Sequence, residues 1–169
     1  MNIPQIYDYL IRARRDLWAV LENTPDEVLA RPLLEGRRFR CIKDHLFHIP
    51  MVEDGWLHCT VLGDQPVLEH FPALKQLGDS PDCSGLALEM LLEYWKAVEQ
   101  RNKSYFTTLT ESQLERVVED SPTERYKLDG VLWHVLTHEM RHCAQIAIML
   151  RMQGIKPPAL DLLFYLPNF

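Results

Sequence analysis

The chain has 169 residues, of which 47% are hydrophobic and 25% are charged, and its formal net charge is −6. These values are typical of one globular domain, which we expect over residues 1–169, and the acidic balance disfavours a protein that binds nucleic acid through its phosphates. No uncharged apolar run is long enough for a transmembrane helix, and the N-terminus lacks the apolar stretch of a signal peptide, so we expect a cytoplasmic protein that does not bind membranes.

The first predicted helix covers residues 3–22. Its apolar residues recur at three- and four-residue steps, which gives one apolar face along the helix. Asn2 can cap this helix, and Pro4 is compatible with its first turn. Residues 24–27, Thr-Pro-Asp-Glu, resemble a capping box and predict a short helical turn that ends before Pro32. The apolar face contains Ile6, Tyr9, Leu10, Ala13, Leu17, Val20 and Leu21.

The second long helix is predicted over residues 41–61. Pro50 lies inside its pattern, where a proline costs about 3 kcal/mol and removes one backbone hydrogen bond, so we expect a kink or a local irregularity. Residues 62–83 contain several prolines and glycines and predict a long connecting loop. The buried side of the helix is expected to contain Ile42, Leu46, Ile49, Val52, Trp56 and Cys59.

The third long helix is predicted over residues 84–108. Residues 110–113, Thr-Glu-Ser-Gln, have the pattern of another capping box, so we expect a short helix to follow. The pattern over residues 117–128 predicts an irregular segment or a small extended excursion. The apolar face of the long helix contains Leu88, Leu91, Leu92, Trp95, Val98, Tyr105, Phe106 and Leu109.

The fourth long helix is predicted over residues 129–153. Asp129 can cap its start, Gly154 can end it, and the two prolines at 157–158 prevent its continuation. The tail, residues 159–169, is rich in leucine. A monomer rarely exposes so much apolar surface, so we expect the tail to pack back on the helices.

Four long amphipathic helices without a convincing strand predict an all-α protein, an antiparallel four-helix bundle with long crossing loops. The four cysteines include no Cys-x-x-Cys pair, so zinc-ribbon and thioredoxin-like sites lack support. We expect reduced thiols, as in a cytosolic protein, that act as small buried apolar residues. They are Cys41, Cys59, Cys83 and Cys143.

Three histidines, His134, His138 and His142, repeat every four residues along the fourth helix. Each step advances about 6 Å and about 40° past a full turn, so neighbours in the row can bind one metal ion at about 2.0–2.1 Å per nitrogen. His134 and His142 are about 12 Å apart and cannot share an ion. If these are not ordinary polar histidines at the bundle surface, the spacing predicts a metal site that uses His138 with either His134 or His142.

The same segment reads HEMRH over residues 138–142 and matches HExxH, in which two histidines bind zinc and the glutamate is a general base. Glu139 would be that base. Most families with this motif take a third ligand further along the chain. Here Ile148 stands where the extended histidine pattern needs a ligand, and Asp161 is the only acidic residue after the motif. A metal-dependent hydrolase is therefore an alternative that rests on an incomplete motif.

The second long helix offers a third ligand, because helical bundles build metal sites from side chains on facing helices. It carries His45 and His48. Helical phase slightly favours His45, which lies nearer the direction of Ile42, Ile49 and Trp56. The helix is apolar almost all round, so this signal leaves the choice between the two histidines open.

The chain resembles the DinB/YfiT-like family of metalloenzymes in three segments, and the predicted helices agree with that family over nearly the whole chain. Residues 48–56 place an aromatic residue eight positions after a histidine. Residues 132–151, which include HVLTHEMRHCAQIAIMLR, are similar to the family segment H-x3-H-x3-H-R-G-Q-I. Residues 154–158, followed by Asp161, are similar to its closing stretch.

The resemblance implies a metal ion held by His48, His138 and His142, with water or substrate in the open positions. His134 would then lie outside the ligand set. Zinc and nickel suit such a site best, and iron and manganese are also compatible with it. The chain departs from the family pattern at the two residues after His142, where cysteine and alanine replace the usual arginine and glycine, so a role for that arginine is in doubt.

By the same resemblance, we expect a metal-dependent transferase that uses a small thiol cosubstrate on an electrophilic small molecule. A metal-bound thiol is deprotonated near neutral pH, which makes this chemistry reasonable. Glu53 and Glu139 are candidate proton carriers, or else solvated charges on their helices. The family and the apolar tail indicate a homodimer. The alternatives are a non-catalytic metal-binding stress-response protein and the hydrolase based on HEMRH.

Overall fold

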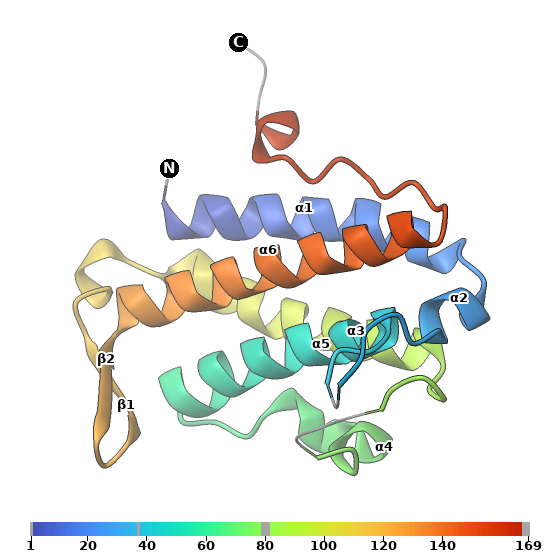
Figure 1. The fold of residues 1–169 in the computed structure, drawn as a ribbon. Coiled ribbons are helices and arrows are strands. Elements are labelled where there is room, and N and C mark those ends of the chain that lie inside the picture. Colours follow the sequence, from blue (N-terminus) through green and yellow to red (C-terminus); the bar gives the residue numbers. More distant parts are fainter. Residues whose placement is uncertain (1, 37, 79–81, 167–169) are drawn as a thin grey trace.

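The computed structural model describes residues 2–36, 38–78 and 82–166 and shows a bundle of four long helices with a small hairpin at one end (Figure 1). The prediction of an all-α four-helix bundle is confirmed. The long elements are α1 (Ile3–Glu22), α3 (Ile42–Asp54) with its π-helical continuation η1 (Gly55–Val61), α5 (Leu88–Thr108) and α6 (Leu128–Met152). The short elements are α2 (Asp26–Ala30), η2 (Val67–His70), α4 (Pro72–Lys75), η3 (Glu111–Gln113), β1 (Val117–Ser121), β2 (Glu124–Lys127) and η4 (Leu162–Tyr165).

The helices do not all run antiparallel to their neighbours, which corrects one part of the prediction. α3 packs against α5 and α6, and α1 packs against the same two helices, so α1 and α3 lie diagonally across the bundle. One apolar cluster joins the C-terminal halves of α1 and α6 to the N-terminal halves of α3 and α5, and a second joins the opposite ends. α1 and α6 therefore run parallel, and α3 and α5 run in the opposite direction (Figure 1). The long connection between α3 and α5 makes this possible because it returns the chain along the bundle.

Local signals begin α1 where the sequence predicts it. The Asn2 side chain accepts a hydrogen bond from the Gln5 N–H at 3.1 Å, and the Gln5 side chain accepts one from the Asn2 N–H at 2.9 Å. This capping box satisfies backbone donors that the first turn leaves free. The capping box predicted at Thr24 does not form, because the Thr24 hydroxyl donates instead to the Val20 carbonyl at the end of α1.

The helix predicted over residues 41–61 changes character along its length. α3 continues through Pro50 to Asp54, and wider π-helical turns follow from Gly55. A π-helix bonds residue i to residue i+5 and takes more residues per turn, so side chains after Gly55 leave the face that a 3.6-residue period assigns to them. Cys59 is accordingly exposed, although the period placed it on the buried side.

The connection between α3 and α5 contains the short helices η2 and α4, where the sequence predicts a loop. The buried Asp54 carboxylate anchors this connection. It accepts hydrogen bonds from the backbone N–H groups of Val67 and Leu68, at 2.8 and 2.9 Å, and from the Tyr94 hydroxyl at 2.9 Å. His58 contacts the same carboxylate from one turn further along. These bonds hold η2 against α3 and α5.

The segment between α5 and α6 confirms two predictions. The capping box between Thr110 and Gln113 forms and begins η3. The predicted extended excursion is an antiparallel hairpin of β1 and β2, in which Val117 lies opposite Lys127. After the hairpin the chain enters α6 directly at Leu128, one residue earlier than the sequence indicates.

The C-terminal tail packs on the bundle only in part. Leu160 and Leu162 lie against the apolar cluster formed by the N-terminal halves of α1 and α6, as predicted. Leu163 and Phe164 are 73% and 68% exposed, so the prediction of a fully packed tail is wrong for them. Residues 167–169 of the predicted tail lie outside the described residues.

A buried ion-pair cluster joins all four long helices at the centre of the bundle. Arg14 of α1 donates hydrogen bonds to Glu53 of α3, to Glu99 of α5 and to both carboxylate oxygens of Glu139 of α6, the last two at 2.6 Å. The four side chains are all buried. A second cation, the half-exposed Arg15, also pairs with Glu99. Three buried carboxylates therefore share one buried guanidinium, and we call this group the Arg14 cluster.

Replacing Arg14 by methionine leaves the three carboxylates of the Arg14 cluster without their buried cation. Removing one partner of a buried ion pair costs about 3–5 kcal/mol, so we expect the free energy of unfolding to fall by about that amount. Urea unfolding of the metal-free protein measures the change. The control is Arg125→Met, since Arg125 pairs with Glu119 on the exposed surface of the hairpin, where the loss should be about 1 kcal/mol or less. Equal losses in the two variants would contradict this role of Arg14.

Candidate metal centre

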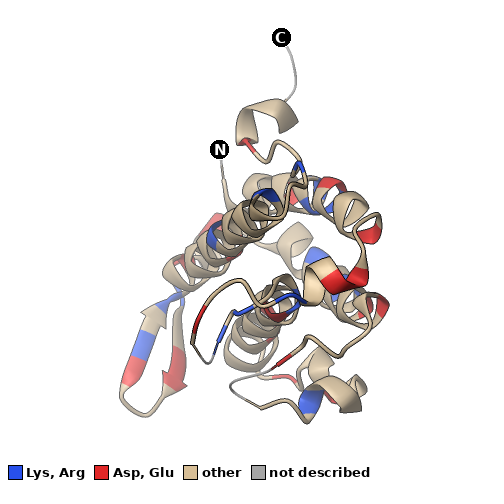
Figure 2. Cartoon of the chain, turned by 45° about the vertical axis from the view of Figure 1, so that its right-hand side comes forward, with Lys and Arg blue, Asp and Glu red and all other residues tan. Residues whose placement is uncertain are grey.

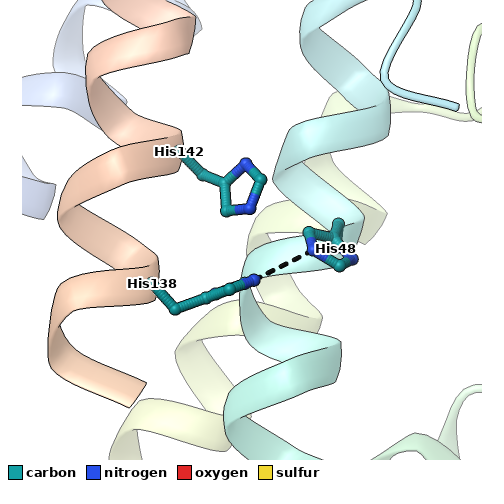
Figure 3. Close-up of side chains that lie close together, drawn as sticks. All are labelled: His48, His138 and His142. Atoms are coloured by element: carbon teal, nitrogen blue, oxygen red, sulfur yellow. Dashed lines mark hydrogen bonds between the residues drawn. The ribbon is translucent and has the colours of Figure 1, made fainter. Parts of the chain in front are cut away.

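Three histidines from two helices converge between α3 and α6 (Figure 3). His138 and His142 project from α6 one turn apart, and His48 projects toward them from α3. Their candidate ligand nitrogens all lie within 4.8 Å of one another. The Nε2 atoms of His48 and His138 are 3.0 Å apart. Of the two pairings that the spacing on α6 allows, the structure brings together the one between His138 and His142.

This histidine cluster has the donor atoms and separations of a metal site. A tetrahedral ion at about 2.0–2.1 Å from each imidazole nitrogen holds its ligand nitrogens about 3.3 Å apart. The 3.0 Å separation between the His48 and His138 nitrogens is close to this value. His138 and His142 are buried, and His48 is partly exposed. The donor set therefore fits a divalent ion, and three protein ligands leave a coordination position open.

Burial and mutual proximity keep these imidazoles neutral at neutral pH. Burial, followed by the neighbouring His142, lowers the pKa of His48 to about 4 and that of His138 to about 3. Burial also lowers the pKa of His142. A neutral imidazole can offer a nitrogen lone pair to a metal, whereas a doubly protonated ring cannot. The protein therefore does not need to remove protons from these side chains to bind an ion at neutral pH.

His45 lies beside the histidine cluster and is not part of it. Its ring is fully buried, and its Nδ1 atom is 3.2 Å from Nδ1 of His142. Helical phase slightly favoured His45 as the third ligand, but the structure brings His48 to the other two histidines. Burial, together with the neighbouring His142, lowers the pKa of His45 to about 4.

An aromatic side chain that the sequence did not single out packs against the histidines. Phe39, between α2 and α3, has its ring centroid 5.1 Å from that of His45, 4.6 Å from that of His48 and 5.4 Å from that of His142. Its φ angle is 58°, a left-handed conformation that is rare for a bulky residue. Such strain persists where surrounding contacts hold it and clusters at functional sites. A loop residue has no periodic pattern, so the sequence offers no signal for Phe39.

The remaining histidine of the row on α6, His134, lies outside the cluster. It is exposed, and its ring packs edge-on against Trp56 at a centroid distance of 5.6 Å. Its ring centroid is 5.9 Å from that of His138. His134 therefore lies outside the group of nitrogens formed by His48, His138 and His142.

The two candidate proton carriers, Glu53 and Glu139, both belong to the Arg14 cluster. Glu53 also accepts hydrogen bonds from the Tyr7 hydroxyl and the Asn102 amide, each at 2.9 Å. Burial raises the pKa of the Glu139 carboxyl, although Arg14 opposes this effect. The general base of an HExxH site must be free to take a proton from water. Both oxygens of Glu139 are held by Arg14, which argues against the hydrolase.

Together these features define a helical-bundle protein with a candidate three-histidine metal centre. A model of the DinB family matches residues 1–168, and the chain therefore belongs to the DinB family. Among solved structures, it is similar to a conserved protein from Enterococcus faecalis, with a TM-score of 0.70 and 16% identity over 90% of this chain and 97% of that one. This likeness supports the fold alone. A search of curated proteins finds no match.

The metal-free protein should lose stability as the pH falls below about 6.5. The folded-state pKa values of His45, His48 and His138 are about 4, 4 and 3, against 6.5 for an unperturbed histidine. Between these folded-state values and pH 6.5, the unfolded chain therefore binds more protons than the folded chain. Each extra proton adds about 1.4 kcal/mol per pH unit to the slope of the unfolding free energy against pH. The stabilisation is complete above about pH 6.5 and is lost as the pH falls through the folded values. Urea unfolding between pH 7 and pH 4 measures the slope.

Two glutamine variants test the origin of this slope. His138→Gln removes one of the buried titrating groups and should give a shallower dependence on pH. His134→Gln is the matched control on the same helix, and it should leave the slope unchanged because His134 is exposed. An identical slope in both variants and the wild type would show that the buried histidine is not responsible.

Proposed function

We propose that the protein is a metal-dependent transferase that joins a small thiol to an electrophilic small molecule. The observation that carries the proposal is the triangle of neutral imidazoles at His48, His138 and His142. Three protein ligands leave a tetrahedral ion open to an exogenous ligand, as in catalytic zinc sites. We favour zinc or nickel, with iron or manganese as the other compatible ions, because histidine does not choose sharply among them.

The chemistry of the proposed reaction is a substitution at carbon. A carbon–sulfur bond forms, the bond from that carbon to the leaving group breaks, and the thiol proton passes to solvent. His48, His138 and His142 would hold a divalent metal, which would supply the acidity that lets a bound thiol ionise near neutral pH. The neutral imidazoles would hold the ion, and Phe39 packs against the rings of His48 and His142.

We retain Glu53 and Glu139 in the proposal as proton-holding groups close to the ligands in sequence. Glu139 follows His138 directly on α6, and burial raises the pKa of its carboxyl against the opposing effect of Arg14. Arg14 contacts both glutamates, so it links the position of the Glu53 carboxylate on α3 to that of the Glu139 carboxylate on α6. Their effect on the metal centre is exerted through α3 and α6, because both carboxylates belong to the Arg14 cluster.

We further propose a cytoplasmic homodimer that does not bind nucleic acid. Figure 2 shows basic and acidic residues interspersed along the helices and the hairpin, and the formal net charge is −6. Within the described ranges, no helix has the length and apolar character needed to span a bilayer. The exposed apolar side chains that support a dimer lie at the end of α6 and in the tail: Ile148, Met152, Leu163 and Phe164.

Metal binding should depend on the histidine cluster and not on the row of histidines along α6. We expect about one zinc ion per chain in the wild type, a large loss in His138→Ala and retention in His134→Ala. Protein purified without an affinity tag, loaded with zinc and desalted, can be measured by elemental analysis. An ion that binds only the folded state stabilises it by mass action. Zinc should therefore also raise the melting temperatures of the wild type and of His134→Ala, but not that of His138→Ala. Equal zinc content in all three proteins would refute the site.

Transferase activity should require the loaded metal centre. With zinc or nickel bound, we expect the protein to accelerate the loss of free thiol and the release of chloride from a chromogenic aryl chloride. The assay is run with a panel of low-molecular-weight thiols that includes cysteine and glutathione. His138→Ala should lose the acceleration, and His134→Ala should keep it.

Two outcomes separate this proposal from its alternatives. A metal-loaded protein that turns over none of the thiols would favour the non-catalytic metal-binding protein. Metal-dependent hydrolysis that disappears in Glu139→Gln would favour the hydrolase.

A further inference from the structure

His142 uses the two sides of its ring for different contacts. Its Nε2 side faces His48 and His138 (Figure 3), and its Nδ1 atom lies 3.2 Å from Nδ1 of His45. Two such nitrogens form a hydrogen bond only if one carries a proton and the other offers a lone pair. The residues His45 and His142 are 0% and 5% exposed, so bulk water has little access to this pair.

The requirements of a metal ligand decide which nitrogen carries the proton. A neutral imidazole has one ring proton, and the nitrogen that binds a metal must be free of it. If Nε2 of His142 offers its lone pair to an ion, the proton of that ring resides on Nδ1. The acceptor is then Nδ1 of His45. The reverse arrangement would place a proton on Nε2 of His142 and remove its lone pair from the site.

Packing holds His45 in the orientation that this role requires. Its ring stacks on Phe39, with centroids 5.1 Å apart and planes inclined by 19°. Its other nitrogen, Nε2, is buried and has no hydrogen-bond partner among the described residues. An apolar side chain would fill the same place without the cost of burying an unpaired polar atom. Packing alone therefore does not account for a histidine at this position.

We propose that His45 is a positioning residue of the metal centre, which accepts the Nδ1 proton of His142 and so keeps the Nε2 lone pair of His142 directed at the ion. This inference rests on the proposed three-histidine site and goes beyond it, because His45 supplies no ligand. A hydrogen bond at the second nitrogen of a metal-binding histidine fixes its tautomer, and removing the partner costs about 10- to 100-fold in affinity.

Two substitutions separate this role from packing. His45→Phe keeps an aromatic ring against Phe39 but has no acceptor. His45→Asn places its side-chain oxygen near the position of the lost Nδ1. We expect His45→Phe to weaken binding of Co²⁺ about 10- to 100-fold and His45→Asn to restore an affinity close to that of the wild type. Titration with Co²⁺ against a chromophoric chelator measures the affinity, and the visible cobalt spectrum reports on the ligand set.

A matched control tests Gln145, a further polar neighbour of the His142 ring. Gln145→Leu should bind Co²⁺ with the wild-type affinity. A loss in Gln145→Leu without a loss in His45→Phe would assign the positioning role to Gln145 and overturn the proposal. Equal losses in His45→Phe and His45→Asn would also overturn it, because they would show a need for the imidazole itself.

A measurement on the wild type decides the question even if His45→Phe fails to fold. In the zinc-loaded protein labelled with ¹⁵N-histidine, multiple-bond NMR spectra identify which ring nitrogen of His142 is protonated. We expect Nδ1, and protonation at Nε2 would overturn the proposal. A wild-type chain that binds neither Co²⁺ nor zinc would refute the metal centre itself, whereas normal binding in every variant would refute only the role of His45.

Discussion

The arrangement of the helices depends on the buried guanidinium of Arg14. It reaches from α1 to carboxylates on the other three long helices, so a rotation of α3 or α6 about its axis would separate a buried charge from its partner. Successive residues of an α-helix point about 100° apart. When Glu139 faces Arg14, the adjacent His138 is turned toward α3. The same constraint that satisfies the buried charges therefore also sets the direction of the histidines.

Much of the fold could be predicted because helical periodicity is a local property. The repeat of apolar residues located all four long helices, Asn2 marked the start of α1, and Thr110 marked the start of the short helix η3. Periodicity shows which face of a helix is buried, but it does not show which neighbour covers that face. The parallel direction of α1 and α6 follows from contacts between distant segments. The π-helical turns from Gly55 put Cys59 on the surface against the period.

The candidate site was predictable to the extent that it lies on one helix. Spacing along α6 identified His138 and His142, because four residues return a side chain to nearly the same face. It could not choose between His45 and His48, since ten of the thirteen residues of α3 are buried and its pattern has no clear phase. The resemblance to a known family supplied His48. The contacts of Glu139 were beyond the sequence because its partner Arg14 comes from a helix 125 residues earlier.

The separation of the histidines along the chain affects how an ion would act on folding. His48 and His138 are 90 residues apart. An ion bound by both histidines would act as a cross-link. The entropic cost of closing a loop grows with the logarithm of its length. An unfolded chain could chelate an ion locally through the two histidines of α6, but it would have to close this long loop to recruit His48. If His48 binds the ion, tight binding therefore requires the native tertiary structure. Occupancy of the centre is then coupled to the cooperative folding of the bundle.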